Sequence, residues 1–333
     1  MRDNYRIGLG EAIDRLITVD VSARGVIGDL YKASRKQTKR PLTLYAAEKL
    51  NETIQRNDLV YILSGFQTTK WNSSETDGPV GALLLANALR KGLKALPVII
   101  TEDFNIPIIK RATIGLGLTL YESSDDAHGR GFKVIGITLK DDIQEITETL
   151  FKSEKPTTVV SVERAGWNEK HIYHDMRGRD ISHLNASLDP IFKEAQRQKI
   201  LTIGIGDGGN EIGMGNIKET VKRSVPYGAR CNCPCRGGIA ANTTADVIVT
   251  STISNWGVDG IIACLSGIMK NPTILHDRAT EYNTIESCVQ AGAYDSVLNS
   301  RAVSVDGVPG EIHTALVDFL HTTVQSWLKR QQI

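Results

Sequence analysis

The sequence lacks the features that mark several large classes of protein. Its 333 residues contain no apolar run near the roughly 20 residues that a membrane-spanning helix needs. The 39 basic and 38 acidic side chains nearly cancel, so no electrostatic case exists for binding nucleic acid or an anionic membrane. Residues 1–16 carry acidic groups and no apolar run, which argues against a secretory signal or a transit peptide. We expect a cytoplasmic protein of a bacterium or archaeon, and a homo-oligomer is compatible with the sequence.

Cysteine is scarce, with five residues in the whole chain. Cys264 and Cys288 fall in helical patterns and are expected to be small buried hydrophobes. Cys231, Cys233 and Cys235 form a C-x-C-x-C cluster without an obvious second ligand pair for zinc. Alternate residues of an extended segment point to opposite sides, so we interpret this cluster as an ordinary loop with free thiols.

Two enzyme motifs are also absent. The sequence has no G-x-S-x-G nucleophile elbow and no G-x-x-x-x-G-K-[ST] phosphate loop. The GIGDGG segment matches a dinucleotide fingerprint only loosely, because Asp207 would oppose a pyrophosphate. These absences argue against an α/β-hydrolase, a P-loop nucleotidase and an NAD-binding protein.

Hydrophobic residues make up 41% of the chain, and strand-like runs alternate with helix-like runs. This alternation predicts a three-layer α/β fold, Rossmann-like, with a mainly parallel sheet and helices on both faces. We expect a single domain over 1–333, a helical N-terminal segment over 1–57, and a lid or subdomain edge at 164–189. Strands are predicted at 58–66, 95–101, 117–121, 132–138, 157–163, 200–206 and 246–252, and helices at 41–56, 78–93, 106–115, 141–152, 190–199, from about 210, from about 257, at 280–292 and at 311–330.

The strongest functional signal is the segment GIGDGGNEIGMG, which follows a predicted strand and is predicted to enter a helix. Asp207 would lie at the strand tip and Glu211 one helical turn later, a pair suited to Mg²⁺ or Mn²⁺. The amides of Gly208, Gly209 and Asn210 would favour an anion. Alternatively, Asp207 caps the helix and Glu211 completes a capping box, which leaves the many glycines unexplained.

A second signal is Glu75-Thr76-Asp77-Gly78-Pro79, which opens the predicted helix at 78–93. Asp77 makes a good N-cap with Pro79 in the first turn, but a cap leaves Glu75 unexplained. Both carboxylates are therefore candidate metal ligands as well.

Further strand ends carry polar side chains. Glu163 is a candidate ligand, and Arg164 either holds a substrate carboxylate or forms a surface ion pair. Ser64, Ser254 and Asn255 are candidate substrate contacts. Carboxylates packed together without a cation would repel one another, and a divalent metal resolves that repulsion. The predicted catalytic and metal-binding residues are Glu75, Asp77, Glu163, Asp207 and Glu211.

Histidine offers a general base near neutral pH. His128, His171, His174 and His183 lie in polar stretches, where a solvated loop histidine is the alternative to a catalytic one. His171 and His174 follow Glu163 closely and are the better candidates for a role in a lid.

Phosphoryl transfer is a rival interpretation. Residues 206–214 resemble the metal-binding GDGxND motif of haloacid dehalogenase-like phosphatases, with Glu211 in place of the second aspartate. Glu75-Thr76-Asp77-Gly78 is similar to the DxDG motif of that family, but Glu75 replaces the nucleophilic aspartate. A metal-activated water could still attack a phosphoester. A non-catalytic module that binds an anion is a third hypothesis.

The segments SGF, ETDGP-VGA, SVERAG, GIGDGGNEIGMG and SNWG occur in this order along the chain. Together they resemble the D-glutamate cyclase C-terminal-domain-like family, from about residue 10 to the C-terminus. The resemblance implies a carbon–oxygen lyase that converts D-glutamate to 5-oxo-D-proline and water. Longer eukaryotic members carry an N-terminal hydratase-like domain, so this chain resembles a stand-alone form.

On this interpretation a metal on the five carboxylates polarises the γ-carboxylate of the substrate. Arg164 would hold the α-carboxylate, and glycine-loop amides would stabilise the oxyanion. The expected cofactor is a divalent metal, Mn²⁺ or Mg²⁺. The expected partner is a small anionic substrate, either an amino-acid carboxylate or a phosphoester.

Overall fold

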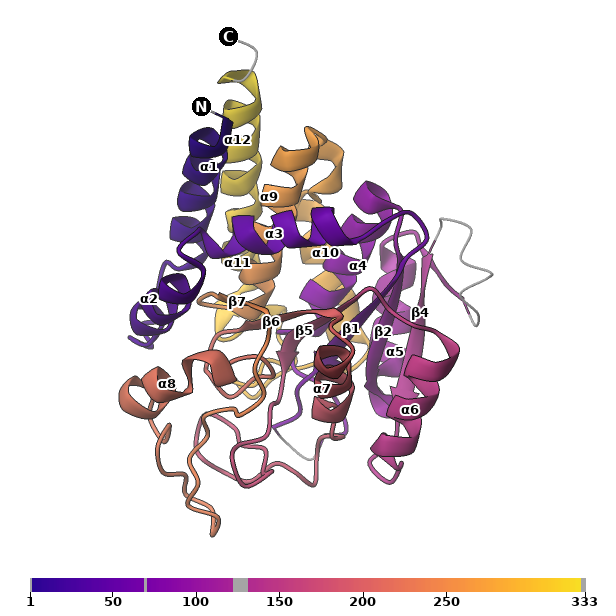
Figure 1. The fold of residues 1–333 in the computed structure, drawn as a ribbon, viewed down its shortest axis with the longest axis vertical. Helices are drawn as coiled ribbons and strands as arrows, with labels where there is room; N and C mark the ends of the chain where they lie inside the picture. The colour runs from indigo at the N-terminus through magenta and orange to yellow at the C-terminus, as the bar shows by residue number, and fades with distance from the viewer. Residues whose placement is uncertain (1, 69–70, 122–130, 331–333) are drawn as a thin grey trace.

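The computed structural model describes residues 2–68, 71–121 and 131–330. Its main feature is a seven-stranded parallel sheet in the order β3-β4-β2-β1-β5-β6-β7 (Figure 1). The strands are β1 (Leu59–Gly65), β2 (Leu96–Glu102), β3 (Thr119–Tyr121), β4 (Gly131–Ile137), β5 (Thr158–Arg164), β6 (Leu201–Gly206) and β7 (Val247–Thr250). A small hairpin of β8 (Ser304–Val305) and β9 (Val308–Pro309) follows near the C-terminus.

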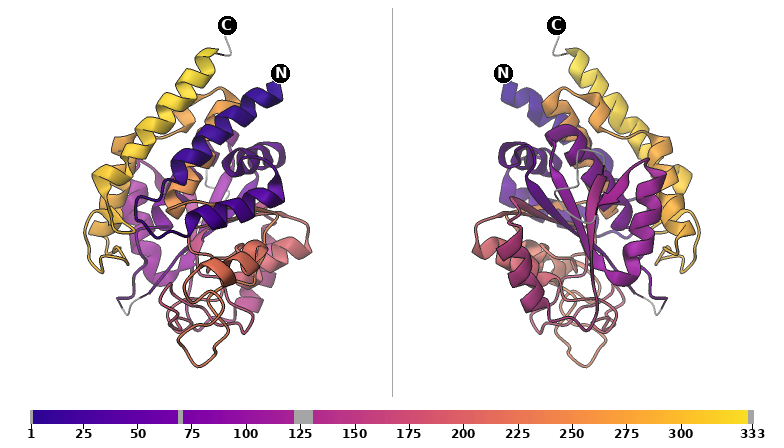
Figure 2. Two further views of the ribbon diagram at one scale, coloured as in Figure 1. Left: turned by 90° about the vertical axis from the view of Figure 1, so that its left-hand side faces the viewer. Right: turned by 90° about the vertical axis from the view of Figure 1, so that its right-hand side faces the viewer.

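Helices surround the sheet and confirm the expected three layers (Figure 2). On one side lie α1 (Arg2–Ile17), α3 (Leu42–Thr53), α4 (Pro79–Leu93), α5 (Ile106–Gly115), α9 (Ser254–Met269), α10 (Arg278–Gln290) and α12 (Ala315–Arg330). On the other lie α2 (Ile27–Thr38), α6 (Ile143–Ser153), α7 (Asp189–Arg197) and α8 (Lys218–Ser224). The short helix α11 (Gly310–His313) and the 3-10 turns η1 (Asp103–Asn105), η3 (Gly215–Ile217) and η4 (Pro272–Ile274) complete the order.

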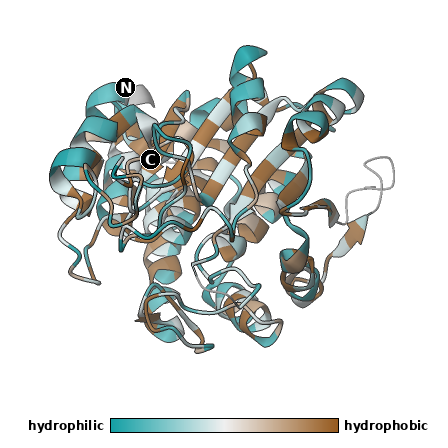
Figure 3. Ribbon diagram, turned by 90° about the horizontal axis from the view of Figure 1, so that it is seen from below, coloured by the Kyte–Doolittle hydropathy of each residue, from teal (hydrophilic) through white to brown (hydrophobic). Residues whose placement is uncertain are grey.

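Both faces of the sheet are buried, which explains why its strands read as continuous apolar runs. In β1, Val60 and Ile62 belong to the core on one face, whereas Tyr61 and Leu63 belong to the core on the other. Figure 3 shows the same division, with hydrophobic strands inside and hydrophilic outer helix faces. None of the helices in the described ranges is both long and apolar enough to cross a bilayer.

The helical N-terminal segment predicted from the sequence is present as α1, α2 and α3. Asp14 of α1 is buried and connects α1 to the start of α3. Its carboxylate accepts the backbone N–H of Leu42 at 2.6 Å and that of Thr43 at 3.1 Å, and so caps the start of α3. Since α3 packs on α9, this cap fixes the segment against the sheet.

The order of the strands locates the region where chemistry is expected. From β1 the chain moves outward through β2 to the edge, and then returns to β5 on the other side of β1. The carboxyl ends of β1 and β5 therefore flank a topological switch point, where ligands bind in open α/β sheets. Residues 165–188, which follow β5, contain no helix or strand. Their assignment as a lid stays a prediction.

Candidate active site

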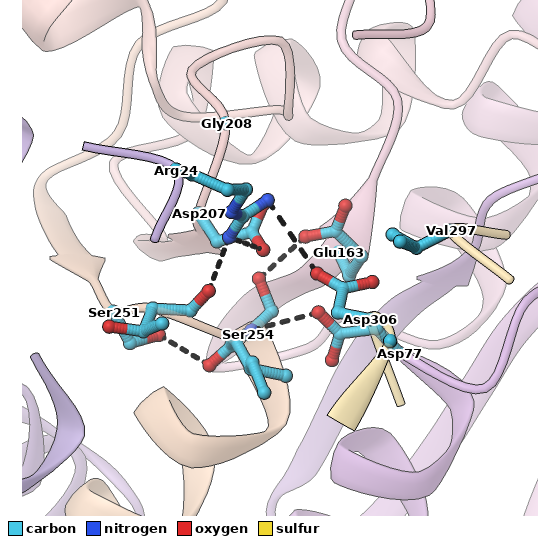
Figure 4. A network of polar contacts seen from close by, with 12 residues as sticks. Arg24, Asp77, Glu163, Asp207, Gly208, Ser251, Ser254, Val297 and Asp306 are labelled. Carbon is cyan, nitrogen blue, oxygen red and sulfur yellow. Dashed lines mark hydrogen bonds and ion pairs between the residues drawn. The ribbon is translucent and has the colours of Figure 1, made fainter. Parts of the chain in front are cut away.

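Acidic side chains from four parts of the chain gather at this switch point (Figure 4). Asp77 precedes α4, Glu163 lies in β5, Asp207 follows β6, and Asp306 occupies the turn between β8 and β9. Carboxylate oxygens of Asp77, Asp207 and Asp306 lie within 4.8 Å of one another, and those of Glu163, Asp207 and Glu211 form a second such group. The structure thus brings together four of the five carboxylates predicted from the sequence.

Glu75, the fifth predicted carboxylate, lies close by but outside both groups. It is 5% exposed and lines the same cavity as Glu163 and Asp207. Its carboxylate is hydrogen-bonded to Ser296 and is repelled by the charges of Asp77 and Asp207. Glu75 therefore lines the cavity without belonging to either carboxylate group.

Asp77 holds two helix starts in place. Its two oxygens accept the backbone N–H groups of Ser254 at 2.9 Å and Asn255 at 2.8 Å, so it caps α9. In return, the Asn255 side-chain oxygen accepts the N–H groups of Gly78 and Gly81 at the start of α4. Because this amide is buried and occupied, the expectation that Asn255 contacts substrate is wrong.

Glu163 is directed into the site by an irregularity in β5. The register with β1 passes from Ser64 opposite Val162 to Gly65 opposite Arg164, which leaves Glu163 as an extra residue. Its φ of 41° lies in the left-handed region, which an ordinary residue adopts only under local constraint. Such bulges redirect side chains near active sites. The Ser254 hydroxyl, predicted to contact substrate, donates to Glu163 at 2.5 Å.

The glycine-rich loop after β6 does not enter a helix, contrary to the sequence-based expectation. Glu211 folds back and accepts the N–H groups of Gly208 at 2.7 Å and Gly209 at 2.8 Å. Gly209 has a φ of 92°, which a helix cannot accommodate, and α8 begins only at Lys218. The amides of Gly208 and Gly209 are thus occupied, which corrects the prediction that they bind an anion. The capping-box alternative for Glu211 fails with the helix, although its carboxylate does satisfy backbone amides.

Gly206 shows why this loop needs glycine. A Cβ atom at this position would lie 2.6 Å from the Glu211 carboxylate. Absence of a side chain therefore lets Glu211 approach the tip of β6 and hold Asp207 toward the site.

Arg24 and Asp306 also belong to the site, and neither is among the site residues predicted from the sequence. An Arg24 guanidinium nitrogen lies 2.6 Å from Asp207, and another lies 3.6 Å from Asp306. The same guanidinium donates to the carbonyl of Thr252 (Figure 4). The signal for Asp306 was the Asp306-Gly307 pair between Val305 and Val308, which is typical of a two-residue hairpin. No local pattern marks Arg24.

Arg164 does not reach the site, which corrects the expectation that it holds a substrate carboxylate. Its side chain is fully buried, 2.7 Å from Glu102, and it also donates to the carbonyls of Gly65 and Ala186. These bonds tie β5 to β1 and β2 beneath the site. Ser64 is buried, and its hydroxyl has no hydrogen-bond partner among the described residues.

The gathered carboxyl groups are electrostatically strained. Burial raises the pKa of Asp77 to about 8, and the charge of Asp207 adds to the shift. Burial likewise raises the pKa of Glu211 to about 7. Burial first and neighbouring carboxylates second hold the pKa well above its ordinary value at Glu75, Glu163 and Asp306. Burial alone would lower the pKa of Arg24, but Asp207 and Asp306 raise it.

A cavity of about 180 Å³ is lined by four of these carboxyl groups, those of Glu75, Glu163, Asp207 and Asp306. It is smaller than the ~300–1,000 Å³ that is common for drug-sized ligands, so it suits a small molecule. The side chains of Arg24, Arg177, Arg179 and Asn210 line the cavity beside these carboxylates. A wider hollow of about 740 Å³ lies between α2 and α8, but it has no buried carboxylate among its described lining residues.

Histidine does not line this cavity in the part of the chain that the structure describes. His171 is exposed and contacts Trp167, and His174 faces the cysteine-rich loop. His183 lies on the irregular segment after β5, and His128 lies outside the described residues. A buried carboxylate is thus the better placed base.

The residues present fit a divalent cation. Six carboxyl groups share the site with the Arg24 guanidinium. Burial raises the pKa of Asp77, Glu163 and Glu211 among them, and the charges of neighbouring carboxylates add to the shift. Hard oxygen ligands in this number are what Mg²⁺ and Mn²⁺ prefer.

Comparison with known proteins identifies the family of the chain. The chain matches the family described as D-glutamate cyclase-like, C-terminal, over residues 13–321. It is also 31% identical over 207 residues to the mitochondrial D-glutamate cyclase of Homo sapiens, a match that covers 60% of this chain and 31% of that protein. The matched part of the chain thus spans less than a third of the length of this relative. Because the family match spans nearly all of the sheet and every site carboxylate, the protein belongs to the D-glutamate cyclase-like family.

Proposed function

We propose that the protein is a metal-dependent lyase that cyclises D-glutamate to 5-oxo-D-proline and water. One observation carries the proposal: a small cavity at the switch point of the sheet combines an inner group of carboxylates with arginines along its wall. This arrangement matches an amino acid, because its ammonium group is cationic and its carboxylates are anionic. Family membership supports D-glutamate as the substrate of this proposal.

The metal would be Mn²⁺ or Mg²⁺. One of two groups that share Asp207 would hold it: Asp77, Asp207 and Asp306, or Glu163, Asp207 and Glu211. When bound, the cation neutralises the carboxylates and supplies Lewis acidity to a substrate oxygen.

The arginines of the cavity would orient the substrate. Arg177 and Arg179 are exposed at the cavity, and Arg24 lies deeper, beside Asp207. We assign to these three side chains the grip on the substrate carboxylates that the sequence had suggested for Arg164. Holding both carboxylates would fold the substrate so that its amine approaches the γ-carbon.

The carboxylates would also move protons. Cyclisation forms one C–N bond and breaks one C–O bond, and two ammonium protons leave with the departing oxygen as water. A buried carboxyl group whose pKa is raised above its ordinary value can accept and return a proton. Glu163 is placed for this task, because it lines the cavity and burial raises its pKa.

A direct assay separates the three hypotheses. Metal-free protein is supplied with Mn²⁺ or Mg²⁺ and offered D-glutamate, L-glutamate and a panel of phosphoesters. The proposal expects 5-oxo-D-proline from D-glutamate only with added metal, and none from the Asp207→Asn variant. Phosphate release that the same variant abolishes would indicate a phosphatase instead, and inertness toward every compound would indicate a binding module.

A further inference from the structure

Three thiols and one imidazole meet in a part of the molecule that the cyclase proposal does not use. The Sγ atom of Cys231 lies 3.4 Å from that of Cys233 and 3.3 Å from that of Cys235. The Nε2 atom of His174 lies 3.3 Å from the Cys233 sulfur and 3.5 Å from the Cys235 sulfur. All four atoms lie within 4.8 Å of one another. We propose that these four residues form a structural zinc site.

The spacing suits a tetrahedral ion. With Zn–S near 2.3 Å and Zn–N near 2.0 Å, the edges of a tetrahedral site measure roughly 3.5–3.8 Å. The four separations given above are slightly shorter than these edges, so a small outward movement of those side chains would admit the ion. Three thiolates and an imidazole complete four-coordination and leave no position open, which is the pattern of structural rather than catalytic zinc.

The chemical environment also fits a soft metal site. Cys231 and His174 are each 1% exposed, so water has little access to these two ligands, whereas Cys235 is half-buried. The Cys235 sulfur accepts the backbone N–H of Gly237 at 3.3 Å, with the Asn168 amide nitrogen 3.6 Å away. Hydrogen bonds of this kind orient metal-bound thiolates.

Charge balance supports the assignment. Binding zinc displaces the protons of three thiols, so the site with neutral His174 carries a net charge of −1. Two cations lie next to it: Lys170 donates to the carbonyl of Cys235 at 2.6 Å, and Arg236 donates to the carbonyl of Cys231 at 3.4 Å. Lys170 and Arg236 thus offset the negative charge of the zinc-loaded site.

The sequence argument against a metal here rested on the lack of an obvious second ligand pair and, in addition, on an extended backbone; the structure contradicts the extended backbone. Residues 231–235 form bends and turns, so the three cysteines point to one side. The fourth ligand comes from residue 174, which lies N-terminal to the cysteines and far outside the spacing of common zinc motifs.

The site would join two segments that have little regular structure of their own. His174 belongs to residues 165–188, and the cysteines belong to the long loop between α8 and β7; both lie at the lower end of the molecule in Figure 2. Backbone bonds from Asn232 and Cys233 to the carbonyl of Gly178 reinforce the junction. A zinc ion would add binding energy to two segments that contain no helix or strand.

This junction stands directly behind the carboxylate cavity. The carbonyl of His174 accepts the side-chain N–H of Asn210 at 2.8 Å, and Asn210 lines the cavity. Asp175, Met176 and Arg177, which follow His174, line it too. The zinc site would therefore position one wall of the cavity without contacting the substrate.

Metal analysis tests the site without any substrate. Protein purified under reducing conditions from zinc-replete cells should contain one zinc ion per chain, released when a mercurial titrates the thiols. Cys231→Ser and Cys235→Ser should lose this zinc. Two matched controls should keep it: Cys288→Ala, a buried cysteine elsewhere in the core, and Asp207→Asn, which alters only the carboxylate group.

Cobalt substitution covers the case in which the serine variants do not fold. Wild-type protein loaded with Co²⁺ should show the visible bands of a tetrahedral ion and a thiolate charge-transfer band. Purified protein without zinc, in which the thiols of Cys231, Cys233 and Cys235 all react freely, would overturn the proposal. A disulfide between two of the three clustered cysteines in freshly isolated protein would overturn it as well. Cyclase activity plays no part in these readouts, so they are independent of the proposed function.

Discussion

Raising the pH should destabilise the protein when the carboxylate site holds no metal. Burial raises the pKa of Asp77 from 3.8 to about 8 and that of Glu211 from 4.5 to about 7. Below about pH 4 both the folded and the unfolded chain carry these protons, and the contribution to stability is complete. Between about pH 4 and pH 8 the unfolded chain has released them while the folded chain retains them, so the free energy of unfolding falls.

The expected loss of unfolding free energy follows from the two pKa shifts. One pKa unit corresponds to about 1.4 kcal/mol, so the shift at Asp77 alone is worth on the order of 5 kcal/mol once both states are ionised. The two carboxylates interact, so their contributions do not simply add. At about 2.1 cal/mol/K per residue, the unfolding entropy of the 333-residue chain is about 0.7 kcal/mol/K, so a loss of about 5 kcal/mol lowers the melting temperature by about 7 °C.

Thermal unfolding followed by circular dichroism measures how the melting temperature changes with pH. The protein is dialysed against a chelator, its metal content is checked, and it is melted from about pH 5 to pH 9 with and without Mn²⁺. Added Mn²⁺ should restore the melting temperature most at high pH, because the cation favours the ionised carboxylates. Asp77→Asn should flatten the slope, since an amide does not titrate. A melting temperature that stays constant or rises over this range in the metal-free protein would refute the reasoning.

Three substitutions test other parts of the account. Gly209→Ala should cost about 1–3 kcal/mol in denaturant unfolding, because its Cβ would lie 2.4 Å from a Val221 methyl at a φ of 92°; Gly28→Ala, in an open helical position, should be neutral or stabilising. Arg164→Ala should cost about 3–5 kcal/mol by leaving a buried carboxylate unpaired, and an altered KM without lost stability would contradict its structural role. Glu163→Gln should raise the melting temperature of the metal-free protein near pH 8 yet weaken Mn²⁺ binding in calorimetry by at least about tenfold, and unchanged affinity would count against its place at the metal.

Much of the fold could be predicted because its sheet is buried on both faces. Runs such as residues 58–66 read as strands, and the amphipathic segments between them read as helices. The carboxyl ends of parallel strands meet at one edge, so the positions of Asp77, Glu163 and Asp207 after predicted strands were enough to expect them to gather.

Other features depend on contacts that no local pattern records. The helix expected from about 210 fails because Glu211 takes up the amides of its own loop. Arg24 reaches Asp207 from a loop 183 residues away in sequence, and only the packing of α1 and α2 places it there. His174 likewise meets Cys233 across 59 residues. Such pairings are set by tertiary structure and carry no periodicity.

The central claim is that distant carboxylates share one divalent cation in the cavity. Crystals grown without metal and soaked in Mn²⁺ test it directly through anomalous scattering at the manganese edge. The account predicts a peak against Asp207, with Asp77 and Asp306 or Glu163 and Glu211 beside it, and no such peak in crystals of Asp207→Asn. Well-ordered Asp207 without a peak in the soaked wild-type crystals would contradict the account.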